Sequence, residues 1–369
     1  MGSKLVANSF NPFRFFIMTQ RNCTVFPNDP DLCDIIVAVR QAMGSLSLIG
    51  CLFIIVVIWL FKKNQIFTWR LILYLSIAAC LNSITFLMPG FLSEGPLCNF
   101  QAWWLTFFIW AVVLWACCIT FNLYQNAIRT MRTEKYERIY HFISWGVALV
   151  ASCIPFIGNH YGPADMWCWI HGKSSRAQVM RFVTFYIPLW CMIAYMLLTY
   201  FVIVWKLRRM VDRYGGTYSP ELERQREFLR KDVKLLRAYP LVYMVLSIFP
   251  SVNRIQNAFD DKKIFGLLLM QTISSPLFGV VSALVFTFDK ETRKLLTWSS
   301  FKNAIYQRMH ARPGIVSEYP IIQTTGSVLS RVTSDGITNF STSADVAITV
   351  NQNCDDVSKQ TTPGDTGIV

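Results

Sequence analysis

Long apolar runs separated by short polar stretches occupy the chain as far as residue 288. A run of roughly 18 or more residues can cross about 30 Å of hydrocarbon as a helix, because each residue advances the helix by about 1.5 Å. Seven runs are long enough, namely 35–61, 69–92, 98–124, 140–158, 182–205, 235–258 and 264–288. The pattern therefore predicts an all-α membrane protein, built as a bundle of seven transmembrane helices.

Three flanking segments complete the predicted organisation. Residues 1–34 form a leader without a convincing signal peptide, so we expect the first helix to act as its own signal. In residues 289–312, apolar side chains recur at spacings of three and four, which predicts an amphipathic helix on the inner membrane surface. Residues 313–369 are rich in Ser, Thr, Gly and Asp and poor in large apolar residues, so we expect a disordered tail.

Basic residues predict the orientation, because they are retained in short loops on the cytoplasmic side. The loops after the first, third and fifth helices contain Lys62, Lys63, Arg129, Arg132, Lys135, Arg138, Lys206, Arg208, Arg209, Arg213, Arg224, Arg226, Arg230, Lys231 and Lys234. The opposite loops contain only Lys173, Arg176, Lys262 and Lys263. We therefore expect a plasma-membrane protein with its N-terminus outside and its C-terminus in the cytoplasm. The net charge of +13 is then explained by loops that face anionic lipid and a protein partner, and not by nucleic acid.

Cys98 and Cys168 both fall on the predicted outer side, which is oxidising. Cys98 begins the third helix and Cys168 lies in the loop between the fourth and fifth helices, so we predict a disulfide that holds this loop against the bundle. Asn22 begins a glycosylation sequon in the leader. The sequon lies close to the first helix, and Cys23 within it could form a disulfide with Cys33. Both features count against glycosylation of Asn22.

Three short motifs narrow the class of seven-helix protein. The outer loop reads Met-Trp-Cys-Trp-Ile at 166–170, Tyr239-Pro240 lies early in the sixth helix, and Asn-Arg-Ile-Gln-Asn follows at 253–257. Together with the helix-one stretch 40–55, they resemble the cyclic-AMP-receptor-like (class E) family of G-protein-coupled receptors. The resemblance runs from the first helix to the seventh. It implies a receptor that senses an extracellular ligand and activates a heterotrimeric G protein.

The chain departs from the rhodopsin-like receptors at three places. The inner end of the third helix, 122–129, lacks their acid-Arg-Tyr motif. Ala79 stands where those receptors, and many cyclic-AMP-receptor-like ones, carry an acid, and the seventh helix has Ser275-Pro276 without an Asn-Pro-x-x-Tyr motif. These departures count against sodium-linked regulation and the usual activation switch, and they leave the seven-helix prediction unchanged.

Other functions of membrane helices need residues that the seven predicted helices lack. A retinal protein needs a Lys in the middle of the seventh helix, and 264–288 contains none. A transporter keeps ionisable groups at mid-membrane, and a hydrolase needs paired carboxylates, a zinc motif or a nucleophile and base at depth. We therefore expect no enzyme activity, no cofactor and no metal. A seven-helix scaffold or trafficking protein that binds no ligand remains the alternative, and saturable ligand-dependent signalling would separate the two.

Polar side chains near the outer side are the candidate ligand-binding residues: Arg40, Gln101, Lys173, Arg176, Arg181, Asn253 and Arg254. Their excess of cations favours a small anionic ligand, because a guanidinium can bind phosphate or carboxylate with two donors. The alternative is that Arg40, Arg181 and Arg254 extend from helix ends to lipid headgroups. Cyclic AMP as the ligand is implied by the family resemblance alone.

Basic residues on the cytoplasmic side are the candidate G-protein contacts: Arg129, Arg132, Arg208, Arg209, Arg230, Lys234 and Arg237. The last three share one face of a helix that would extend the sixth span. The alternative is that these charges only retain the loops inside. Pro240 is a candidate hinge, although prolines are common in membrane helices without that role. The tail from Ser327 to Ser343 offers hydroxyls for a receptor kinase and then an arrestin-like partner.

Overall fold

The computed structural model describes residues 25–26, 29–90, 92–129, 133–164, 166–171, 175–213, 236–259 and 263–309. All of these residues belong to one compact unit, 1–312. None of them belongs to the second unit, 313–369. Several predicted sites also lie outside the described residues: Asn22, Arg132, Lys173, Arg230 and Lys234. For Arg176 and Arg208 only the backbone is described.

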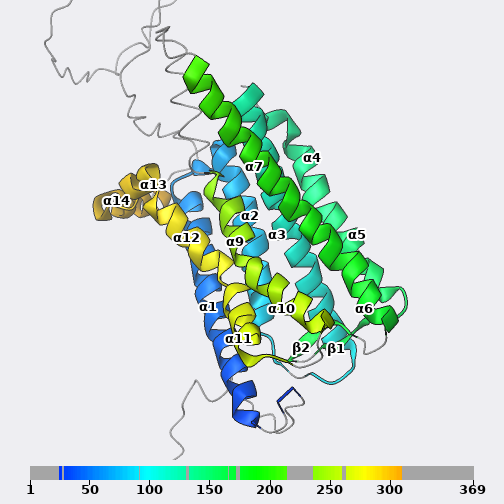
Figure 1. The fold of residues 1–369 in the computed structure, drawn as a ribbon. Helices are drawn as coiled ribbons and strands as arrows, with labels where there is room; N and C mark the ends of the chain where they lie inside the picture. The colour runs from blue at the N-terminus through cyan, green and yellow to red at the C-terminus, as the bar shows by residue number, and fades with distance from the viewer. Residues whose placement is uncertain are drawn as a thin grey trace, which may run out of the picture. The chain divides into compact units, whose positions relative to one another are not determined.

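The first three apolar runs are single helices, α1 (Pro30–Leu60), α2 (Phe67–Leu87) and α3 (Pro96–Arg129) (Figure 1). A one-turn 3-10 helix, η2 (Lys63–Gln65), joins the first two. α3 is the central helix, because 72% of its most apolar stretch is buried inside the protein, against 44% for α1 and for α2. Most of its buried residues are apolar, which explains why α3 can be surrounded by other helices.

The fourth and fifth runs each combine several helical types. The fourth consists of η3 (Glu134–Tyr136), α4 (Glu137–His141), the π-helical η4 (Phe142–Val147), α5 (Ala148–Cys153) and η5 (Ile154–Phe156). The fifth consists of α6 (Ser175–Arg181), the π-helical η6 (Phe182–Tyr186) and α7 (Ile187–Arg213). Pro188 is the second residue of α7, and its missing N–H cannot bond the carbonyl four residues back, which belongs to Thr184 of η6. The π turn adjusts the helix to that lost bond.

A short antiparallel hairpin lies between the fourth and fifth runs. It consists of β1 (Tyr161–Ala164) and β2 (Trp167–Ile170), in a register that pairs Gly162 with Trp169. The hairpin covers one end of the bundle, close to α10 and α6 (Figure 1). Tyr161 fixes it to the fourth run, because its hydroxyl donates to the Ser152 carbonyl at 2.8 Å.

Prolines interrupt the sixth and seventh runs. α9 (Ala238–Leu246) and α10 (Ile248–Phe259) separate at Ser247, three residues before Pro250. α11 (Phe265–Ser274) and α12 (Phe278–Phe288) meet at a 46° bend around Pro276. A proline cannot donate to the carbonyl one turn earlier, so each helix loses a bond where it breaks. A turn at Arg237 likewise precedes Pro240 by three residues, and motion of a hinge there stays a prediction.

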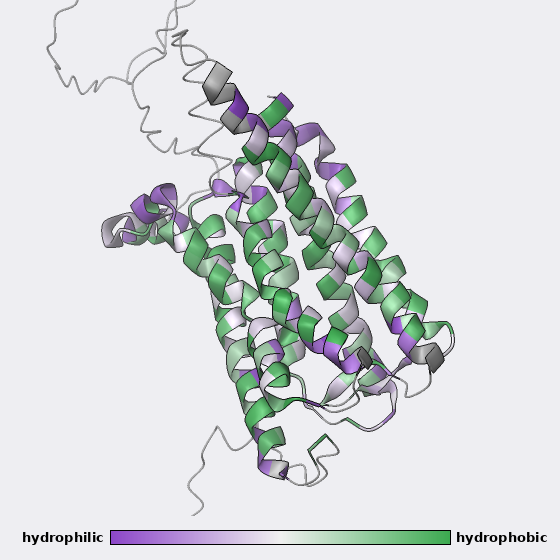
Figure 2. Cartoon of the chain, in the orientation of Figure 1, coloured by the Kyte–Doolittle hydropathy of each residue, from purple (hydrophilic) through white to green (hydrophobic). Residues whose placement is uncertain are grey.

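Within the described residues, five helices are long and apolar enough to cross a membrane, and the bent pair of α11 and α12 makes a sixth if it counts as one span. Apolar residues cover the middle of the helices, and polar residues gather toward their ends (Figure 2). The chain is therefore a multi-pass membrane protein. The broken run of α9 and α10 does not meet the same test, so seven spans stay a prediction.

Two helices follow the last apolar run, α13 (Lys290–Leu295) and α14 (Trp298–Met309). Asp289 caps α13 by accepting hydrogen bonds from the amides of Glu291 and Thr292 at 3.0 and 3.2 Å. Arg308 of α14 donates to the Trp59 carbonyl and lies 4.6 Å from the Trp59 ring centroid. α14 is thereby attached to the end of α1 opposite the hairpin (Figure 1). Its place on the membrane surface stays a prediction.

α1 and α12 approach each other closely where both carry a glycine. A Cβ at Gly279 would lie 2.6 Å from both the Ser47 carbonyl oxygen and the Cys51 sulfur. A Cβ at Gly50 would lie 2.8 Å from the Gly279 carbonyl oxygen. Small residues at such a crossing allow two membrane helices to gain van der Waals contact along their backbones.

We predict that Gly279→Ala destabilises the protein by about 1–3 kcal/mol, because the new methyl overpacks the contact between α1 and α12. Gly266→Ala is the matched control, since Gly266 lies in α11 with nothing within 4 Å of the added Cβ. Thermal unfolding of the detergent-solubilised protein measures both. Equal midpoints for the two variants would contradict the close approach.

Candidate ligand cavity

The hairpin is fastened to α3 by a disulfide and by one amide side chain. Cys98, in the first turn of α3, is bonded to Cys168 of β2, which is 70 positions further along the sequence. The Gln101 side chain accepts from the Cys168 amide at 3.1 Å and donates to the Pro89 carbonyl at 3.1 Å. The predicted disulfide is therefore confirmed, and Gln101 is occupied in holding the loops. Cys33 is also disulfide-bonded, while Cys23 lies outside the described residues.

Two tryptophans of the loop motif carry arginine side chains against their rings. The Arg254 guanidinium lies 5.4 Å from the Trp169 ring centroid and 5.9 Å from that of Trp167. The Arg181 guanidinium lies 5.6 Å from the Trp169 ring and also donates to the Ile170 carbonyl at 2.8 Å. The negative face of an indole attracts a cation. β2 thereby links the end of α10 to the end of α6.

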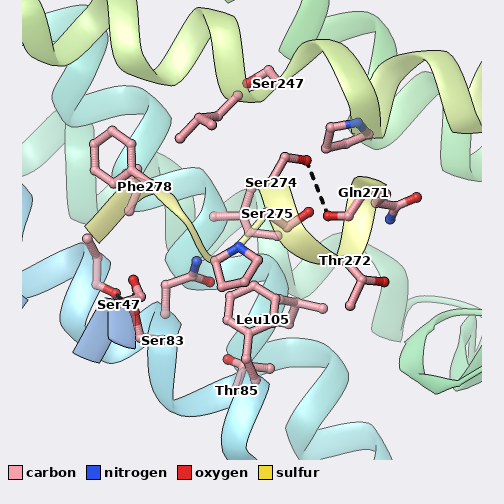
Figure 3. Close-up of a pocket in the computed structure, with 18 of the residues that line it drawn as sticks. Ser47, Ser83, Thr85, Leu105, Ser247, Gln271, Thr272, Ser274, Ser275 and Phe278 are labelled. Carbon is pink, nitrogen blue, oxygen red and sulfur yellow. Dashed lines mark hydrogen bonds between the residues drawn. The ribbon is translucent and has the colours of Figure 1, made fainter. Parts of the chain in front are cut away.

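A cavity of about 150 Å³ opens beneath these rings, among α1, α2, α3, α7, α10 and the broken seventh run. The part of its lining next to the hairpin contains Arg40, Trp167, Trp169 and Arg254. Figure 3 shows part of the polar lining, and the hydroxyl and amide side chains that line the cavity are Ser47, Asn82, Ser83, Thr85, Ser247, Ser251, Gln271, Thr272, Ser274 and Ser275. Among the described residues, no Asp, Glu or Lys lines the cavity. The lining therefore combines two cations and a set of neutral polar groups with apolar side chains such as Leu105, Val112 and Phe278.

Arg40 and Arg254 are both buried, at 4% and 7% exposed. Arg40 of α1 donates one hydrogen bond, to the Met88 carbonyl. The Nε of each arginine has no hydrogen-bond partner, and neither arginine forms an ion pair with a described carboxylate. A buried charged donor without an acceptor is costly, so such groups call for an explanation. A bound anion would supply the missing acceptors.

Some of the neutral polar side chains in the lining already have hydrogen-bond partners within the protein. The hydroxyl oxygens of Ser47 and Ser83 are 2.8 Å apart, and the Ser83 hydroxyl donates to the Ala79 carbonyl at 2.8 Å. The Asn82 Oδ1 and the Thr85 Oγ1 are buried without a partner. The Asn82 Oδ1 can accept a hydrogen bond, and the Thr85 hydroxyl can accept or donate one. This part of the lining therefore suits a neutral polar group of a ligand.

The predicted ligand residues divide into two sets. Arg40 and Arg254 line the cavity, whereas Gln101, Arg181 and Asn253 do not. Asn253 donates to the Gln271 side chain and thereby joins α10 to α11. Sequence reasoning named Trp167 and Trp169 as part of a family motif, but not as neighbours of Arg254. Their contact depends on a fold between distant segments, so no local pattern could predict it.

The opposite end of the bundle carries a different polar network. Arg70 of α2 pairs with Glu137 of α4 at 2.9 Å, and the Tyr74 hydroxyl donates to the same carboxylate at 3.0 Å. Among the candidate G-protein contacts, the described side chains of Arg129, Arg209 and Arg237 are exposed. No group of three metal-ligating side chains occurs among the residues that the structure describes.

Comparison with known proteins gives consistent relatives. A family profile described as slime mold cyclic AMP receptor matches residues 32–318. The chain is 30% identical over 267 residues to G-protein coupled receptor 1 of Arabidopsis thaliana, which covers 71% of this chain and 80% of that protein. It is 29% identical over 277 residues to Cyclic AMP receptor-like protein A of Dictyostelium discoideum, covering 72% and 69%. It is 28% identical over 203 residues to G-protein coupled receptor 157 of Homo sapiens, covering 50% and 59%.

We predict that Cys98→Ser and Cys168→Ser each destabilise the protein by about 2–4 kcal/mol, because each breaks the same link between α3 and β2. The double variant should be no less stable than either single variant. Cys191→Ser is the control, because Cys191 is a free, exposed cysteine of α7. Peptide mapping under non-reducing conditions identifies the bond, and additive losses in the double variant would show that the two thiols act separately.

Proposed function

Because the chain belongs to the slime mold cyclic AMP receptor family of G-protein-coupled receptors, we propose that it senses a small extracellular anion and activates a heterotrimeric G protein. The observation that carries the ligand class is the pair of buried arginines, Arg40 and Arg254, which line a cavity without a described carboxylate partner. The family profile and one of the three relatives above have cyclic AMP in their names, but the cavity chemistry supports an anion in general.

The proposal includes seven spans, with the N-terminus outside and the C-terminus in the cytoplasm of a plasma-membrane protein. The sixth run is less apolar than the other runs because α10 contains Asn253 and Arg254. Both are buried, whereas Ile248, Val252 and Ile255 of the same helix are exposed. An apolar outer face with polar groups turned inward is what a membrane-crossing helix of a bundle requires.

Ligand binding would act on α10 through Arg254. The arginine is held by the faces of Trp167 and Trp169, which attract its charge but accept none of its N–H bonds in the usual geometry. An anion between Arg40 and Arg254 would give these donors acceptors and draw α10 toward α1. The breaks near Pro250 and Pro240 would allow that shift to alter the inner end of the sixth run.

The basic residues of the cytoplasmic side would form the G-protein contact. Arg129, Arg209 and Arg237 end three different helical runs and are exposed. Arg132, Arg208, Arg230 and Lys234 would add to this surface. The tail would serve a receptor kinase and an arrestin-like protein. A scaffold that binds no ligand is the competing proposal, and the buried arginines of the cavity, which lack a described carboxylate partner, favour the receptor.

The proposal is tested by expressing the chain in cells and measuring nucleotide exchange on G proteins. One panel contains small anions such as nucleotides, sugar phosphates, carboxylates and acidic amino acids, and the other contains neutral sugars and uncharged lipids. We expect a saturable response to an anion. A chain that reaches the surface and answers to neither panel would support the scaffold.

We predict that Arg254→Ala lowers the potency of an anionic agonist by at least tenfold, because a charge-assisted hydrogen bond contributes about 1.5–3 kcal/mol. Arg254→Lys keeps the charge but loses the two-pronged geometry, so it should recover only part of the potency. Lys302→Ala, an exposed cation on α14, is the control for surface abundance. Unchanged potency in Arg254→Ala would favour the interpretation that this arginine only extends to headgroups.

We predict that replacing Arg230, Lys234 and Arg237 with Gln lowers agonist-stimulated nucleotide exchange severalfold while surface abundance stays normal. Many other basic residues would still retain the loops inside. The matched control replaces Lys290, Arg293 and Lys294 with Gln, because these are three exposed cations of α13. If both triple variants couple like the original chain, the charges serve orientation only.

A further inference from the structure

A second cavity, of about 470 Å³, lies on the outside of the bundle among α3, the fourth run and α7. Residues at helical spacing form its two walls, Leu114, Cys117 and Phe121 on α3, and Tyr140 and Ile143 on the fourth run. Ile143 is exposed at the rim. Seven residues of helix measure about 10 Å, which is about two thirds of the depth of one leaflet. We call this cavity the α3–α4 groove.

Among the tyrosines that line the α3–α4 groove, Tyr140 brings a buried, unpartnered hydroxyl to a mostly apolar wall. Tyr140 is 3% exposed, and its hydroxyl is buried without a hydrogen-bond partner. The Tyr140 ring is fixed between Phe67 and Phe121, with ring centroids 6.4 Å apart in both pairs. The hydroxyl therefore cannot turn away to water. Fatty acyl carbon alone would leave it unsatisfied.

A cation stands at the end of the same groove. The Lys135 ammonium lies 5.1 Å from the centroid of the Tyr136 ring, and Tyr136 lines the groove. Arg138 is exposed nearby on α4, and Glu137 is already paired with Arg70. Along the fourth run, the Lys135 cation therefore comes first, the Tyr140 hydroxyl second and the apolar side chain of Ile143 third.

We propose that the α3–α4 groove is a binding site for one anionic glycerophospholipid. The phosphate would face Lys135, an ester carbonyl would accept from the Tyr140 hydroxyl, and one acyl chain would lie between Cys117 and Ile143. This order matches a phospholipid read from headgroup to chain end, and basic residues at the membrane surface attract anionic lipid. The site requires only that the bundle crosses the membrane, so it does not rest on the proposed signalling. The proposed topology assigns it to the cytoplasmic leaflet.

The full chain, reconstituted in phosphatidylcholine vesicles, is tested with phosphatidylserine that carries a photoreactive group in its acyl chain. We expect labelled peptides from 114–121 and 136–143, competed by unlabelled phosphatidylserine. Tyr140→Phe removes the hydroxyl and should lower labelling about two- to tenfold, the size of one hydrogen bond. Tyr239→Phe is the matched control, because it removes another buried, unpartnered hydroxyl that does not line the groove.

Two further variants test the remaining parts of the site. Lys135→Gln should abolish the preference for phosphatidylserine over phosphatidylcholine, whereas Lys294→Gln, at an exposed cation of α13, should keep it. Ile143→Trp should fill the groove and remove the label, with the thermal midpoint reporting whether it folds. Equal labelling of Tyr140→Phe and Tyr239→Phe would overturn the proposal. So would a photoreactive sterol that labels the groove and displaces the phospholipid.

Discussion

The link between α3 and β2 is the constraint on which the outer half of the bundle depends. Cys168 is held by the disulfide to Cys98, and its amide is held by Gln101. Neighbouring residues of a strand point to opposite faces. With Cys168 turned to α3, the residues on either side of it, Trp167 and Trp169, face the other way, toward Arg254. One covalent bond thus determines where two indole rings stand over the cavity.

The buried arginines show how the protein keeps charge in an apolar surrounding. Moving an unpaired charge out of water costs many kcal/mol, and pairing with a carboxylate would lower that cost. Here the Arg254 charge lies against two indole faces, and Arg40 uses one backbone carbonyl. Indole rings attract the charge without using the N–H donors. The donors therefore stay available for a ligand, which a salt bridge would have prevented.

The sequence predicted the helices and the disulfide because both follow from local composition and compartment. Every apolar run contains helix in the part of the chain that the structure describes, although α2 ends at Leu87 instead of residue 92 and the last two runs are broken. Cys98 and Cys168 were one pair of cysteines on the oxidising side. The uses of individual polar residues were not predictable, because they depend on segments far apart in sequence. Gln101 bridges Pro89 and Cys168, and Asn253 bonds Gln271. The break at Pro250 was readable as a proline in a helix, but proline alone does not tell how much a helix bends.

Both broken helices border the cavity, and this gives the arrangement a mechanical consequence. Ser247 and Pro250 of the sixth run line it, as do Ser274, Ser275 and Pro276 of the seventh. A break in a membrane helix exposes backbone groups that lipid cannot satisfy, so it is tolerated only next to protein or a polar cavity. A ligand that fills the cavity would replace water or empty space at both breaks at once. Because α12 is packed closely against α1 through Gly279 and Gly50, a shift of α12 would require repacking of that contact, and for this reason we assign the proposed movement to the sixth run.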